Sequence, residues 1–242
     1  MGKVKRPRGG ENGGGWRRHE SAAIARSLAC VQCYLPALDE GGGRTVALAP
    51  CYVGVLLTVA YHTGRRISSI CRLTRDRMIR DAGGAIVAIR WPPLKEEDEK
   101  EVPVRAEVGT VLAAQLARVD AWAAVIGWTP GPRTALFPRN LALTKWTRPM
   151  PPPPAIDRHT ATAWLTRAEA LAVIGSTSLP KLISGLWHPY RRSFPTRRKH
   201  LPRRDVADAA GWKDQETMAR CYEQGDADTL RRVLDDDTRL GQ

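Results

Sequence analysis

The sequence predicts one mostly helical α+β domain with a small antiparallel sheet. Apolar residues recur at helical spacing in several segments of the chain, which indicates amphipathic helices. Two short segments rich in strand-forming residues flank a polar turn, which indicates a single hairpin. The 242 residues show no internal repeat and are enough for one large domain with a buried core.

The first strong helix is predicted over residues 50–64, and Gly64 suits its end. Its inward face is formed by apolar residues at helical spacing: Val53, Leu56, Leu57, Ala60 and Tyr61. A shorter helix is expected to follow directly, over residues 66–73.

A strand is predicted over residues 85–91, and its partner over residues 101–104. The polar residues 92–100 between them are expected to form the hairpin turn. Pro103 cannot donate a backbone hydrogen bond, so the second strand should lie at or near the edge of the sheet.

Helices account for most of the remaining chain. One is predicted over residues 108–126, with an inward stripe of Leu112, Leu116, Val119, Ala123 and Ile126. Another is predicted over residues 158–175, with Trp164, Ala168 and Leu171 facing inward. The proline-rich residues 148–155 between them indicate a stiff linker or surface loop. Shorter helices are expected around the basic residues 191–204 and over residues 214–223 and 226–236.

The two ends of the chain differ in charge. Residues 1–19 hold six basic side chains and one acid in a glycine-rich segment, and we predict a disordered basic arm there. Residues 20–36 are compatible with one helix. Beyond residue 222 the chain turns acidic, and a terminal helix is predicted over about residues 225–238. From the residues alone, we expect that helix to dock on its own domain.

The charge balance favours a nucleic-acid partner. The chain has 38 basic and 25 acidic side chains, a formal net charge of +13 and an isoelectric point near 10.1. No segment reaches the roughly 18 apolar residues of a membrane span, and the N-terminus lacks the apolar part of a secretion signal. We therefore expect a cytoplasmic protein with no membrane partner. Cys30 and Cys33 have half of a zinc-site spacing without a second pair, so no metal is expected.

Two basic groups in the first half are candidates for a phosphate site. Arg65 and Arg66 lie where one predicted helix ends and the next begins, and a guanidinium binds two phosphate oxygens at once. Lys95 lies in the hairpin turn as a long arm able to carry a proton, and Lys100 is the competing choice. On their own, these groups are better explained as solvated charges.

Two further groups lie in the second half. His188 and Arg191 share a helix face at i and i+3, inside a run with seven basic residues and no acid between residues 191 and 204. Tyr222 follows Trp212 by ten residues, on a helix that Asp214 is expected to cap. On this segment alone, Tyr222 is better explained as a buried structural residue.

In chain order these residues resemble the catalytic domain of the tyrosine recombinases, the phage integrase family. The family's "TGxRIxE" box resembles residues 63–69, and its "HxLRHxFAT" box resembles "HPYRRSFPT" at residues 188–196. Its "LGH" or "LGW" segment ending in tyrosine resembles "AGWKDQETMARCY". The resemblance covers about residues 45–225 and implies a tyrosine recombinase-type catalytic domain over residues 20–242.

The resemblance implies a site-specific recombinase or integrase of a mobile genetic element, acting on double-stranded DNA through a 3′-phosphotyrosine intermediate. Tyr222 would attack the scissile phosphate, which Arg66 and Arg191 would bind. His188 would act as acid or base, and Lys95 would protonate the leaving 5′-oxygen. Trp212 would donate its indole N–H to the phosphate.

Because the covalent link stores the energy of the broken bond, neither ATP nor a metal nor another cofactor is expected. The family also implies a homo-tetramer on two DNA duplexes, in which the terminal helix can instead dock on a neighbouring subunit. Further contacts to DNA are expected from basic residues near the site: Arg65, Arg192, Arg197, Arg198 and Lys199.

Two features depart from the family pattern. Ser69 stands where the family has an acid that supports the first arginine. A separate core-binding domain is not recognisable before residue 45, so we expect weak, salt-sensitive target binding by this chain alone. Two alternatives stay open: a type IB topoisomerase-like enzyme, which uses the same residue types on one duplex, and a non-catalytic DNA-binding remnant of an integrase.

Overall fold

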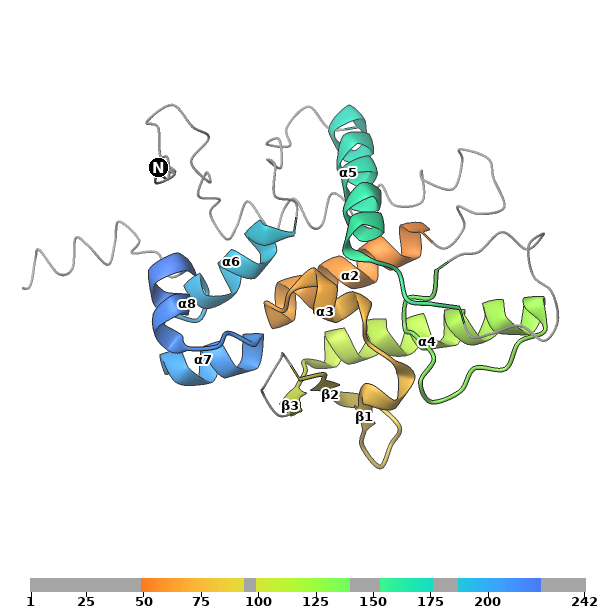
Figure 1. Cartoon of the computed structure of the whole chain (residues 1–242), viewed down its shortest axis with the longest axis horizontal. Coiled ribbons are helices and arrows are strands. Elements are labelled where there is room, and N and C mark those ends of the chain that lie inside the picture. Colours follow the sequence, from red (N-terminus) through yellow and green to blue (C-terminus); the bar gives the residue numbers. More distant parts are fainter. Residues whose placement is uncertain (1–48, 94–98, 140–152, 176–186, 223–242) are drawn as a thin grey trace, which may run out of the picture.

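The computed structural model describes residues 49–93, 99–139, 153–175 and 187–222. Over these residues the chain is mostly helical with one small antiparallel sheet, as predicted (Figure 1). Several predicted features lie outside the described residues: the basic arm, the helix at 20–36 with Cys30 and Cys33, Lys95, most of the proline-rich segment, and the acidic helix at 225–238. None of the described helices is long and apolar enough to cross a membrane.

Helix α2 (Ala49–Thr63) lies at the centre of the domain (Figure 1). Four helices pack against it: α3 (Ile67–Cys71), α4 (Ala106–Ile126), α5 (Arg158–Gly175) and α6 (His188–Thr196). Seven of its apolar residues expose no more than 3% of their surface: Tyr52, Val53, Val55, Leu56, Leu57, Val59 and Ala60. The spacing predicts one inward face, but the structure buries the helix on several sides because neighbours surround it.

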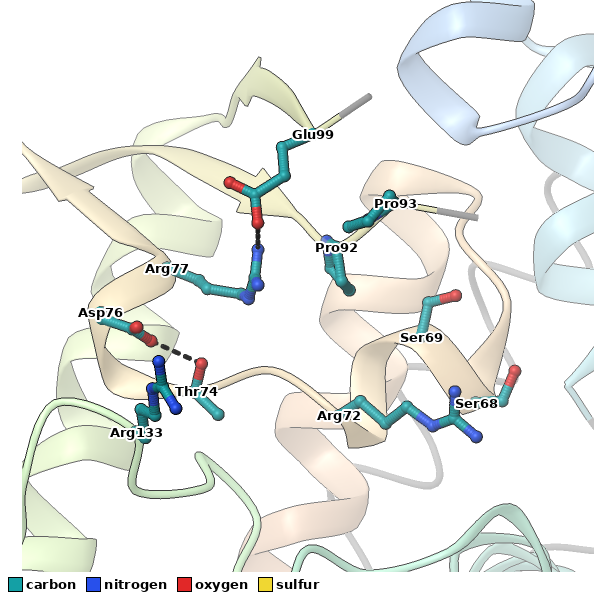
Figure 2. A pocket seen from close by; sticks show the side chains of 10 residues that line it. All are labelled: Ser68, Ser69, Arg72, Thr74, Asp76, Arg77, Pro92, Pro93, Glu99 and Arg133. Atoms are coloured by element: carbon teal, nitrogen blue, oxygen red, sulfur yellow. Dashed lines mark hydrogen bonds and ion pairs between the residues drawn. The ribbon is translucent and has the colours of Figure 1, made fainter. Parts of the chain in front are cut away.

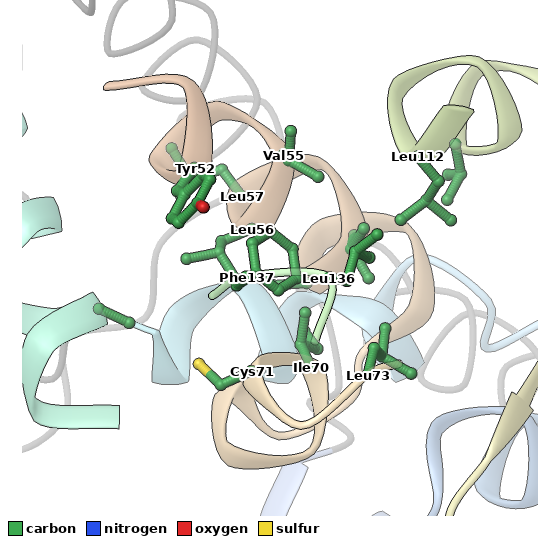
Figure 3. Packing of buried hydrophobic residues seen from close by; sticks show 14 of the residues in the cluster. Tyr52, Val55, Leu56, Leu57, Ile70, Cys71, Leu73, Leu112, Leu136 and Phe137 are labelled. Carbon is green, nitrogen blue, oxygen red and sulfur yellow. The ribbon is translucent and has the colours of Figure 1, made fainter. Parts of the chain in front are cut away.

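The main core lies where α2 meets α3 and the segment at residues 136–137 (Figure 3). The Tyr52 ring meets Phe137 edge-on at a centroid distance of 5.5 Å, and its hydroxyl donates to the carbonyl oxygen of Pro138 at 3.2 Å. Gln115 on α4 donates to the carbonyl oxygen of Leu136 at 2.9 Å. Each large apolar side chain buried here contributes about 1.5–3 kcal/mol, so this core holds α2 and the start of α3 in place.

The sheet has three antiparallel strands in the order β1 (Met78–Arg80), β2 (Ile86–Trp91) and β3 (Lys100–Pro103). Strands β2 and β3 confirm the predicted hairpin, and Pro103 lies on an edge strand as expected. Strand β1 was not predicted, because three residues are too few to show alternation. Helix α4 lies close to β2, since a Cβ on Gly109 would overlap the carbonyl oxygen of Ile86.

A second, smaller core joins α6 to the two described helices that follow it, α7 (Arg203–Ala210) and α8 (Gln215–Tyr222), shown in blue in Figure 1. Its buried residues are Phe194, Val206, Ala207, Ala210, Trp212 and Met218. Asp214 caps α8 as predicted, because its carboxylate accepts hydrogen bonds from the backbone N–H and the hydroxyl of Thr217. The short helices expected around the basic run are therefore present and packed together.

Candidate active site

The turn between α2 and α3 separates two neighbouring arginines. Gly64 ends α2 with φ of 64°, a left-handed conformation that glycine adopts without strain. The Phe194 side chain packs so closely that a Cβ on Gly64 would lie 2.6 Å from its Cγ. Beyond the turn Arg65 is only 4% exposed, whereas Arg66, the N-cap residue of α3, is exposed.

Arg65 links this turn to the end of α7. Its Nε donates to the carbonyl oxygen of Ala209 at 2.9 Å, and its Nη2 donates to that of Asp208 at 3.2 Å. Its guanidinium lies over the Trp91 ring, 4.9 Å from the centroid. We expected a DNA contact from this arginine, but a buried guanidinium held by carbonyl oxygens fits a role in positioning α7.

Arg191 bridges the same two helix ends from α6. Its Nη1 donates to the carbonyl oxygens of Gly64 at 2.5 Å and Ala210 at 3.0 Å, and its Nη2 donates to that of Gly211 at 3.4 Å. Its guanidinium stacks on the Trp212 ring, 3.9 Å from the centroid. The residue is 4% exposed, so it forms the inner wall of the candidate site.

The two buried arginines act together at the C-terminus of α7. Gly211, with φ of 64°, ends this helix, and the N–H groups of Gly211 and Trp212 donate back to the carbonyl oxygens of Asp208 and Ala207. The last carbonyls of a helix lack partners within the helix and carry the negative end of its dipole. Arg65 and Arg191 donate to four consecutive carbonyls there, at residues 208–211. The segment that holds Trp212 is thereby fixed to the α2–α3 turn.

Lys100 connects the sheet to the same helix. It begins β3, and its Nζ lies 2.7 Å from the Oδ1 of Asp208 on α7. Both side chains are about half exposed, so the ion pair contributes at most about 1 kcal/mol. Lys95, the other candidate for the catalytic lysine, lies outside the described residues.

The basic run after Arg191 packs against aromatic rings. Arg197 stacks over Tyr61 at 3.7 Å and donates to that residue's carbonyl oxygen, and burial lowers the pKa of its guanidinium to about 10. Arg198 stacks over Phe194 at 3.9 Å, and burial also lowers its pKa. Lys199 is exposed, and the side chain of Arg192 lies outside the described residues.

His188 and Tyr222 are placed through their backbones. His188 is the first residue of α6 and Tyr222 is the last residue of α8, and these two helices pack against each other. Arg191 lies one turn after His188, as the spacing predicts. The side chains of His188 and Tyr222 lie outside what the structure describes.

The structure thus brings together Arg65, Arg191 and Trp212, with Arg66 beside them on the surface. It also adds residues that the sequence did not single out: Trp91 under Arg65, and Asp208 between Arg65 and Lys100. No local pattern could have found them, because Arg65 and Asp208 are 143 positions apart. Within the described part of the chain, His, Cys, Asp and Glu side chains do not gather in groups of three that could hold a metal ion.

Comparisons with known proteins link this geometry to one fold. No protein-family model and no curated protein sequence matches the chain. Among solved structures, the XerA recombinase matches with a TM-score of 0.57 and 14% identity, over 91% of this chain and 65% of that one. The Tn1549 transposon integrase in complex with circular intermediate DNA matches with a TM-score of 0.55 and 15% identity, over 93% and 67%.

The XerH site-specific recombinase, solved in a pre-cleavage complex with its difH substrate, matches with a TM-score of 0.58 and 15% identity, over 90% of this chain. The chain spans 54% of the XerH chain and about two thirds of the other two. At such identities the likeness concerns the fold. The chain has the tyrosine recombinase fold, as its motifs predicted.

Proposed function

We propose that this chain is a DNA strand-breaking and rejoining enzyme that uses Tyr222 as its nucleophile. The main support is that the segments carrying the motifs meet at one place. Arg191 of α6 bonds to the end of α2 and to the end of α7 and stacks on Trp212, while Lys100 ties the hairpin to α7. The structure thus brings together motif residues more than 120 positions apart in the sequence, which supports a common role for them.

The reaction would begin with attack of the Tyr222 phenolic oxygen on a DNA phosphorus atom. The bond from phosphorus to the 5′-oxygen breaks, which leaves a 3′-phosphotyrosine and a free 5′-hydroxyl. Lys95, or Lys100 in its place, would give the leaving oxygen its proton, and His188 would take the phenolic proton. Attack by the 5′-hydroxyl of a partner strand reverses these steps, so no ATP or metal ion is required.

Arg66 and Arg191 would bind the oxygens of the scissile phosphate. Arg66 is exposed and carries no side-chain hydrogen bond or ion pair to any other described residue, so its guanidinium is available to an incoming anion. Arg191 lies deeper and is oriented by the carbonyls of Gly64, Ala210 and Gly211. Trp212 would hold that orientation through its stacking contact and donate its indole N–H.

The partner would be double-stranded DNA, and strand exchange would take place in a homo-tetramer on two duplexes. The net charge of +13 supports polyanion binding in general. Exposed Lys199 and Arg66, with Arg192, would add contacts to the DNA backbone, whereas Arg197 and Arg198 would contribute through their stacked, partly buried guanidiniums.

The test is covalent capture on nicked duplexes from which the cleaved end diffuses away. Because the target is unknown, a randomised duplex pool at low salt is used, and denaturant-resistant protein–DNA adducts are scored. The wild type and the matched control Tyr61→Phe should form adducts, while Tyr222→Phe should form none. An adduct that persists in Tyr222→Phe would disprove the assigned nucleophile. DNA binding without any adduct would favour the non-catalytic remnant, and relaxation of a single supercoiled duplex without strand exchange would favour the topoisomerase-like alternative.

A further inference from the structure

A pocket of about 610 Å³ opens between α3, the short turn η2 (Arg75–Arg77) and the base of the β2–β3 hairpin. Figure 2 shows Ser68, Ser69 and Arg72 on one side of it and Arg77 and Arg133 on the other. Among the described residues, none of those assigned to the proposed cleavage chemistry lines this pocket. In the part of the chain that the structure describes, it is a separate feature of the surface.

The pocket has more basic than acidic groups. Its three arginines face two acids, Asp76 and Glu99. Glu99 is already paired, because its Oε1 lies 2.9 Å from Nη1 of Arg77. The carboxylate of Asp76 accepts the hydroxyl of Thr74 at 2.5 Å.

Two of the arginines remain available to a ligand. Arg72 and Arg133 are exposed, and neither makes a side-chain hydrogen bond or ion pair with another described residue. Beside Arg72 lie the hydroxyls of Ser68 and Ser69, the latter only 8% exposed. Guanidinium forks together with hydroxyl donors are the groups that proteins use to bind phosphate oxygens.

The position of the pocket indicates which phosphate it can take. Arg66 and Arg72 flank the two ends of α3, six residues apart, which corresponds to about 9 Å along a helix. Consecutive phosphates of one DNA strand lie farther apart than the roughly 3.4 Å rise along the duplex axis, so 9 Å spans about one to two nucleotides. We propose that this pocket binds a phosphate of the DNA backbone about one to two nucleotides from the phosphate that Arg66 contacts. This inference rests on the proposed function for the identity of the ligand.

The experiment measures equilibrium DNA affinity as a function of salt, with every variant made in the Tyr222→Phe background so that no cleavage intervenes. Arg72→Gln combined with Arg133→Gln should reduce the slope of log affinity against log salt by about 0.9, the value for one phosphate contact. The affinity should fall about tenfold, near the lower end of what a charge-assisted hydrogen bond contributes. Glu99→Gln, which frees Arg77, should act in the opposite direction and tighten binding by about threefold.

The matched control is Arg80→Gln combined with Arg118→Gln, which removes two exposed charges outside the pocket. If the pocket variant has the same salt slope and affinity as this control, the inference is overturned. Inorganic pyrophosphate, titrated by calorimetry, separates the two sources of phosphate. Binding of pyrophosphate that depends on Arg72 and Arg133, with DNA binding unchanged, would overturn the assignment to DNA and identify a site for free phosphate compounds.

The two hypotheses fail separately. If the double arginine variant loses DNA affinity and salt slope as expected but the wild type forms no covalent adduct, the proposed catalysis is refuted and the pocket assignment stands. If the wild type forms adducts but the double arginine variant binds DNA as its control does, only the assignment of the pocket to a DNA phosphate is refuted. Glu99→Gln keeps the test decisive if the double arginine variant does not fold, because an unchanged affinity in that variant also contradicts the inference.

Discussion

Replacing Arg65 by methionine should destabilise the fold without touching the exposed part of the site. Methionine keeps the aliphatic stem and removes the guanidinium. The partly buried carbonyl oxygen of Ala209 then loses a hydrogen bond from a charged group, which costs about 1.5–3 kcal/mol. The carbonyl oxygen of Asp208 still accepts a hydrogen bond from the backbone N–H of Gly211. The lost stacking on Trp91 adds about 0.5–2 kcal/mol. Relief from burying a charge offsets part of this loss, and we expect a net destabilisation of about 2–4 kcal/mol.

The measurement is urea unfolding followed by tryptophan fluorescence and circular dichroism. With a slope of about 2–3 kcal/mol per molar urea, the midpoint should fall by about 1 M. The matched control is Arg66→Met, the same change one position later on an exposed residue, which should stay within about 0.5 kcal/mol of the wild type. Equal midpoints for the two variants would refute the assignment of Arg65 to the inside and Arg66 to the surface. Amide hydrogen exchange at residues 203–210 should also quicken in Arg65→Met alone.

Three further outcomes are expected. Gly64→Ala should lower the stability by more than about 2 kcal/mol, because about 1–2 kcal/mol of backbone strain adds to a steric overlap with Phe194. Gly84→Ala, at φ of 82° and with no atom within 4 Å of the added Cβ, should show the strain alone in the same unfolding assay. Burial lowers the pKa of His62 below 6.5, so on acidification the unfolded chain takes up a proton at this residue before the folded chain does. The contribution of His62 to stability should therefore be fully present above pH 6.5 and be lost as the pH falls through the lowered folded pKa. A His62→Gln variant should show a weaker dependence of stability on pH. Burial raises the pKa of the Cys71 thiol to about 12, so mass spectrometry should find that residue unalkylated at pH 8 until urea unfolds the chain.

The elements with a clear period were predictable from the sequence. The helix at residues 158–175 has the predicted bounds, and the hairpin of β2 and β3 differs from its prediction by a single residue at most ends. These elements, and α8 with its capping residue Asp214, depend on signals within a few residues: apolar spacing, a helix cap, and Pro103 at the sheet edge. The order of the motifs then pointed to the fold that the solved structures share.

The roles of the two neighbouring arginines could not be predicted in this way. Arg65 and Arg66 are chemically identical, and nothing within the local sequence says which one turns inward. Arg65 turns inward because the carbonyl oxygens of Asp208 and Ala209 on α7, more than 140 positions later in the sequence, accept its hydrogen bonds. The pocket around Arg72 and Arg133 is of the same kind, because its walls come from segments that only the tertiary fold brings together.

Two glycines at helix ends explain how the site buries positive charge. Gly64 ends α2 and Gly211 ends α7, each with φ of 64°, and Arg191 donates to both carbonyl oxygens. A Cβ on Gly211 would collide with the guanidinium of Arg65, so only glycine leaves room for it.

Each helix end carries a partial charge of about −0.5, so the two ends offset only about one of the two positive charges on Arg65 and Arg191. The remaining charge lies at the α2–α3 turn, which also carries the exposed Arg66. Helix ends therefore stabilise the buried arginines without fully neutralising them, and the surface at Arg66 stays positive where the proposed reaction needs to hold a phosphate.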